Sequence, residues 1–64
     1  MNSTTPEFKK LRQEVKRNLR IIRGHVAAAN MFIDSGDLAR TYEELEKVQF
    51  AGFDAKHVLG KLVR

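Results

Sequence analysis

The sequence predicts an all-α protein: an antiparallel two-helix hairpin that self-associates into a four-helix bundle or a higher homo-oligomer. Apolar residues recur at spacings of three and four along two long stretches, which is the periodicity of an amphipathic helix. A short segment of turn-forming residues, 34–37, separates the two stretches. Nowhere do apolar and polar residues alternate between turn signals, so strands are not expected. At 64 residues the chain is expected to be one domain, residues 1–64.

The first helix is expected at about residues 6–34, preceded by a flexible N-terminus at residues 1–5. Thr5, Pro6 and Glu7 are typical of a helix start, as an N-cap, a first-turn proline and an acid near the positive end of the helix dipole. The apolar positions that follow lie within about 80° of arc at 100° per residue. They are Phe8, Leu11, Val15, Leu19, Ile22, Val26, Ala29 and Ile33.

The second helix is expected at about residues 37–63. Gly36 suits the left-handed position after a helix, and Asp37 suits the N-cap of the next one. Small residues, Gly24 and Gly52 among them, are expected to allow the helices to approach closely. The apolar stripe of the second helix comprises Leu38, Tyr42, Leu45, Val48, Gly52, Ala55, Leu59 and Val63.

Self-association is expected because a lone hairpin of this size has little stability to spare. A compact chain of 7.3 kDa exposes about 4,200 Å², and its hydrophobic gain roughly equals the entropy of ordering the chain. The absence of cysteine removes disulfides as an alternative support. A second apolar line on each helix is expected to stay uncovered by the hairpin. From it come the predicted oligomer-interface residues: Ile21, His25, Phe32, Phe50, Phe53 and His57.

Several classes of function are not expected from this composition. Two helices cannot enclose a substrate pocket of ordinary size, and no nucleophile–base arrangement is evident, so we expect no enzyme activity and no cofactor. The longest apolar run, residues 26–29, is far shorter than the ~20 residues of a membrane span, and no secretory signal is evident. We therefore expect a cytoplasmic protein without a membrane partner. His25 and His57 are expected level with Glu46 and Glu14 respectively, as packing contacts and not as metal ligands.

Positive charge is concentrated in the first half of the chain. Residues 1–32 carry seven basic and two acidic side chains, a net +5, whereas residues 33–64 have a net −1. Most of the basic side chains share one face of the first helix, where they could contact phosphates; the alternatives are a solvated flank beside the apolar stripe and, less favoured, a membrane-surface contact. The candidate anion- or nucleic-acid-binding residues are Lys9, Arg12, Lys16, Arg17, Arg20 and Arg23.

The segment Leu19–Val26, followed by Met31-Phe32-Ile33-Asp34, resembles the first helix of the copper-sensing (CsoR-type) bacterial repressors. The resemblance covers about half of the chain and implies an all-helical, oligomeric DNA-binding protein, with Arg20 and Arg23 at basic positions of the family's DNA-facing surface. This chain has Ala39 where the family's first metal-binding cysteine would fall, and Arg64 ends it where the family's His-x3-Cys pair and third helix would follow. Metal, formaldehyde and sulfide sensing by that scheme are therefore not expected.

The leading expectation is a non-enzymatic homo-oligomer, dimeric or larger, that binds an anionic partner, with nucleic acid in gene regulation the first candidate. One alternative is a protein-interaction adaptor or inhibitor, of the kind that phages and plasmids encode, which docks through Phe50 and Phe53. Another is a nucleotide-binding oligomer with its ligand between subunits, because guanidinium groups bind phosphate in two-point contacts.

Overall fold

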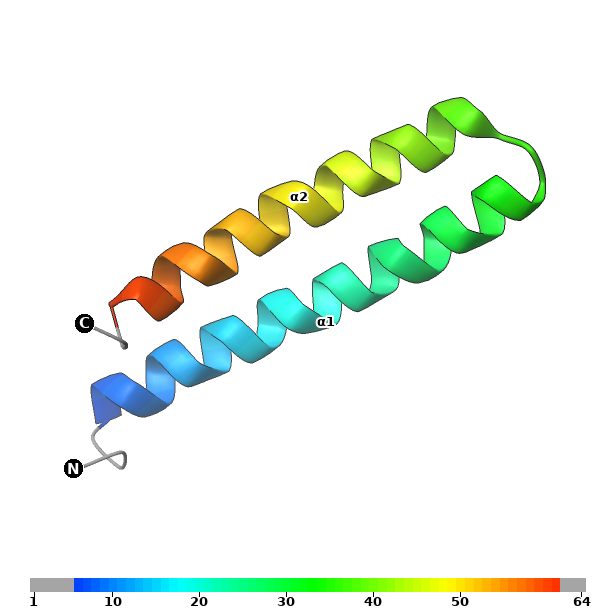
Figure 1. The fold of residues 1–64 in the computed structure, drawn as a ribbon. Coiled ribbons are helices and arrows are strands. Elements are labelled where there is room, and N and C mark those ends of the chain that lie inside the picture. Colours follow the sequence, from blue (N-terminus) through cyan, green and yellow to red (C-terminus); the bar gives the residue numbers. More distant parts are fainter. Residues whose placement is uncertain (1–5, 62–64) are drawn as a thin grey trace.

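The structure is a computed structural model that describes residues 6–61. Helix α1 spans Pro6–Asp34 and helix α2 spans Leu38–Gly60, and the two lie side by side in opposite directions (Figure 1). Residues 6–61 contain no strand. The predicted all-helical hairpin is confirmed. The expected flexible N-terminus at 1–5, the Thr5 cap and the predicted last turn of the second helix at 62–63 lie outside the described residues.

The turn between the helices is closed by two backbone hydrogen bonds characteristic of a helix that ends on glycine. The amide of Asp37 donates to the carbonyl of Phe32 at 2.8 Å, and the amide of Gly36 donates to that of Ile33 at 3.1 Å. Gly36 adopts a φ of +81°, a conformation that side chains with a Cβ disfavour. The turn is therefore tight and depends on glycine, as the sequence predicts.

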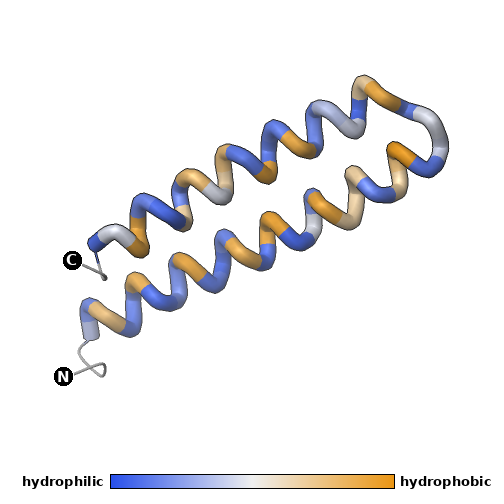
Figure 2. Tube along the Cα trace, viewed as in Figure 1, coloured by the Kyte–Doolittle hydropathy of each residue, from blue (hydrophilic) through white to orange (hydrophobic). Residues whose placement is uncertain are grey.

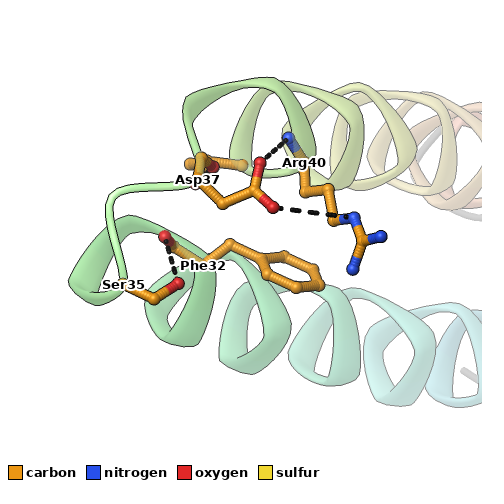
Figure 3. A network of polar contacts seen from close by, with 5 residues as sticks. Phe32, Ser35, Asp37 and Arg40 are labelled. Atoms are coloured by element: carbon orange, nitrogen blue, oxygen red, sulfur yellow. Dashed lines mark hydrogen bonds and ion pairs between the residues drawn. The ribbon is translucent and has the colours of Figure 1, made fainter.

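Asp37 begins α2 in the way that the sequence predicts. Its Oδ1 accepts a hydrogen bond from the backbone amide of Arg40 at 3.0 Å, which satisfies one of the free amides of the first turn (Figure 3). Its Oδ2 lies 3.6 Å from Nε of Arg40, whose guanidinium lies 5.7 Å from the centre of the Phe32 ring on α1. The cap thus also holds a cation against the other helix.

The hairpin seam, defined by the residues that α1 and α2 bury against each other, repeats at spacings of three and four on both helices. Such spacing places one row of side chains on the facing side of each helix. Among residues 6–61 only Val15, Ala29 and Ala55 are buried, and the other seam positions are half-buried. The seam comprises Phe8, Leu11, Val15, Asn18, Ile22, His25, Ala29 and Phe32 of α1, with Thr41, Glu44, Val48, Ala51, Ala55 and Val58 of α2.

The seam of α1 differs from the predicted stripe at three of its eight positions. Leu19, Val26 and Ile33, which were expected to face the second helix, are 50%, 49% and 46% exposed. The preceding seam positions, Asn18, His25 and Phe32, are half-buried in their place. The expectation that the hairpin leaves His25 and Phe32 uncovered is therefore wrong. The physical reason is that α2 offers each of them a polar partner, the Glu44 carboxylate to His25 and the Arg40 guanidinium to Phe32.

The seam of α2 departs from its predicted stripe in the same sense. Leu38, Tyr42 and Leu45 are exposed, whereas Thr41 and Glu44 face α1. Both helices consequently carry apolar residues on the inside and on the outside of the hairpin, and Figure 2 shows hydrophobic and hydrophilic segments alternating along their whole length.

Gly24 and Gly52 do not lie at a point where the two helices approach each other closely. A Cβ added at Gly24 or at Gly52 would meet no atom within 4 Å, leaving aside the backbone of its own helix turn. The prediction that these glycines let the two helices approach closely is therefore wrong for the hairpin, whose small seam residues are alanines.

Candidate functional site

The six basic residues predicted to bind an anion are exposed on α1, five of them along one face and Arg17 further round the helix. We call this set the basic row. All six are exposed, and they extend from Lys9 to Arg23. At 1.5 Å per residue this segment of helix is about 21 Å long. The row consists of Lys9, Arg12, Lys16, Arg17, Arg20 and Arg23.

The members of the basic row converge near the middle of α1. Lys16, Arg17 and Arg20 line a surface hollow together with Gln13. Lys16 and Arg20 also line an adjoining hollow with Arg23 and the exposed Leu19. Up to four cationic side chains can therefore surround an anion that lies on this part of the helix.

No residue of the basic row forms an ion pair with another residue of the described segment 6–61. The three ion pairs found there involve other residues: His25 with Glu44, Arg40 with Asp37, and Lys47 with Glu44. The two carboxylates in these pairs, Asp37 and Glu44, therefore do not neutralise the basic row. The positive charge of the row is available to a partner.

The polar centre of the hairpin is the contact between His25 and Glu44. Nδ1 of His25 donates a hydrogen bond to Oε1 of Glu44 at 2.6 Å, with the two side chains 31% and 14% exposed. This hydrogen bond, helped by the positive charge of Lys47 whose Nζ lies 3.6 Å from Oε2, lowers the pKa of Glu44, although partial burial opposes the change. An ionised carboxylate inside the seam is therefore stabilised by partners from both helices.

The sequence predicts Glu46 opposite His25, whereas the structure places Glu44 there. Glu46 is exposed on the outer side of α2, whereas Glu44 occupies the seam between Thr41 and Val48. Thr41, Glu44 and Val48 follow one another at spacings of three and four, and this pattern could have identified Glu44 as a seam residue. An acidic residue is, however, not normally expected in an apolar seam. His57 was expected beside Glu14; no hydrogen bond or ion pair between them is found in residues 6–61, and His57 is exposed.

The predicted oligomer-interface residues do not form one surface. His25 and Phe32 lie in the hairpin seam, and Ile21 is 43% exposed on α1. On α2, Phe50 and Phe53 are 72% and 70% exposed. Phe53 lines a hollow with Lys56, His57, Gly60 and Lys61, from the last turns of the same helix and the residue that follows it.

Two further kinds of site were sought in the described residues. Within 6–61 no three His, Asp or Glu side chains gather closely enough to hold a metal ion. Neither helix combines the length and the apolar character that a bilayer crossing requires.

Comparison of the chain with known protein families, characterised proteins and solved structures found no match.

Proposed function

We propose that this chain is a non-enzymatic, self-associating helical protein that binds nucleic acid through the basic row of α1, as a regulator of transcription would. The observation that carries the proposal is the row itself: six exposed cations on one helix, none of them in an ion pair within residues 6–61. Each cation placed against a phosphate releases a counterion, so a row of this kind favours a polyanion over a single charge.

The shape of the helix supports the same partner. A rigid helix whose cations extend over about 21 Å can follow several consecutive phosphates of a nucleic-acid backbone. The side chains of Arg20 and Arg23 carry planar guanidinium groups, which form two-point contacts with phosphate oxygens. The same two arginines lie in the segment that resembles the CsoR-type repressors.

Binding to a fluorescent DNA duplex and to a single-stranded RNA, measured by anisotropy at 50 and 200 mM salt, tests the proposal. Four phosphate contacts predict a loss of affinity of roughly 100-fold between the two salt concentrations. Absence of salt-sensitive binding to either probe at 50 mM would refute the proposal.

Single alanine variants identify the surface. Arg20→Ala should reduce the slope of log K against log salt by about 1, whichever the probe sequence. Lys56→Ala is the matched control, because Lys56 is exposed on α2 outside the row and should leave the slope near its original value. An equal effect of the two substitutions would mean that net charge alone, and not the row, is responsible.

A second candidate function rests on the exposed aromatic pair of α2. Phe50 and Phe53 are large, apolar and mostly exposed, as is typical of residues that dock on a protein partner. A double variant, Phe50→Glu with Phe53→Glu, should then lose a captured partner while its nucleic-acid affinity is unchanged. Retained capture by the double variant would exclude this second candidate.

A further inference from the structure

Some of the exposed apolar residues of α1 and α2 lie together on one side of the hairpin. Val26 and Ile33 of α1 and Leu45 of α2 line a single groove, whose floor is formed by Ala29 and Thr41 of the seam. This groove shows that the outer apolar lines of the two helices are neighbours and not on opposite sides. We call this surface the outer face: Leu19, Val26 and Ile33 of α1 with Leu38, Tyr42 and Leu45 of α2.

The outer face repeats with the same period as the hairpin seam. Leu19, Val26 and Ile33 are spaced seven residues apart, and the next helix continues the period with Leu38 and Leu45. In a helix packed on one neighbour only, such positions are expected to be polar; a second apolar line beside the seam is the pattern of a helix inside a four-helix bundle. On each helix, the seam and the outer face together form an apolar surface wide enough to contact two other helices.

The accessible surface of the chain is larger than that of a compact protein of its mass. The chain exposes 5,410 Å², about 1,200 Å² more than the ~4,200 Å² expected for 7.3 kDa. A standard stable interface buries about 800 Å² per partner. An interface of standard size would therefore bury less area per chain than this excess.

We propose that the outer face is the interface with a second copy of this chain, which completes a four-helix bundle. The inference rests on the self-association in the proposed function and names the surface that performs it. A second copy fits because it presents the same heptad-spaced apolar lines, and a two-fold interface requires a surface complementary to itself. The basic row borders this face where Leu19 lies beside Lys16 and Arg23, so the row stays at the edge of the interface and remains accessible.

The interface proposed here differs from the oligomer interface that the sequence predicts, and mutagenesis can distinguish the two. The outer face contains Val26 and Leu45, whereas Phe50 of α2 and Met31 of α1 are exposed at 72% and 71% but lie elsewhere. Replacing an apolar residue by glutamate should disrupt only an interface that covers it. Met31→Glu and Phe50→Glu are thus matched controls for Val26→Glu and Leu45→Glu on the same two helices.

The experiment is the mass of the chain in solution at 10–200 µM, by light scattering or sedimentation equilibrium, with helix content followed by circular dichroism. The wild type and both controls should have at least twice the chain mass. Val26→Glu and Leu45→Glu should have the chain mass, with a helix content that does not rise with concentration. Val26→Ser and Leu45→Ser provide the same comparison if a glutamate prevents folding.

Three results would overturn the proposal. They are a wild-type chain that is monomeric throughout the range, an outer-face variant that stays dimeric, and a dimer dissociated by Phe50→Glu but not by Leu45→Glu. The nucleic-acid measurement is independent: a dimer that fails to bind either probe would sustain this interface and refute the proposed function.

Discussion

The same chemical change, glycine to alanine, should have opposite effects on stability at two positions of this hairpin. Gly24 lies inside α1 with helical geometry, and a Cβ there meets no atom within 4 Å. Alanine lowers the entropy of the unfolded chain, so Gly24→Ala should raise the free energy of unfolding by about 0.8–1 kcal/mol.

At Gly36 there is also room for a Cβ, but the backbone conformation disfavours one. Its φ of +81° lies in the left-handed region, where a Cβ approaches the carbonyl oxygen that follows it in the chain. Gly36→Ala should lower the free energy of unfolding by about 1–2 kcal/mol. The two variants should then differ by roughly 2–3 kcal/mol, or at least ~10 °C in Tm for a domain of this size.

Urea and thermal unfolding followed by circular dichroism measure the difference. All proteins must be compared at one concentration, since association makes Tm depend on concentration. Gly36→Asn is the matched control, because asparagine tolerates left-handed geometry and should cost less than alanine. A Gly36→Ala protein as stable as the wild type, or a Gly24→Ala protein less stable than it, would refute the argument from backbone geometry.

Two further predictions concern the start of α2 and the seam. Asp37→Ala removes the N-cap and should cost about 1 kcal/mol in urea unfolding, whereas Asp54→Ala, an exposed control, should change stability by less than about 0.5 kcal/mol. Because the folded state lowers the pKa of Glu44, its contribution is complete above the ordinary pKa of 4.5 and disappears as pH falls below it. The stability difference between wild type and Glu44→Gln should therefore shrink in acid, as measured by urea unfolding between pH 3 and 7; a difference independent of pH would contradict this account.

The parts of the structure that depend on neighbouring residues could be predicted from the sequence. The turn is one example, because the conformations of Gly36 and Asp37 follow from local backbone sterics and capping. The accessibility of the basic row is another, because lysine and arginine side chains are costly to bury.

The rotation of each helix about its axis could not be predicted in the same way. Leu19 and Val26 are more hydrophobic than Asn18 and His25, so a ranking by hydropathy places them in the seam. The structure places Asn18 and His25 there. A carboxylate on the other helix compensates the histidine, and such pairing across 19 residues has no local signature.

The contact between His25 and Glu44 has a consequence for how the helices are aligned lengthwise. Alanines and other short side chains occupy much of the seam, so sliding α2 by one heptad would keep similar surfaces opposite each other. Such a slide moves Glu44 about 10 Å from His25 and brings it level with Asn18 or with Phe32, according to the direction, so that its carboxylate loses the histidine donor. The hydrogen bond between His25 and Glu44 thereby favours the observed register, and a Glu44→Leu hairpin should remain helical yet show more than one set of inter-helix contacts by NMR.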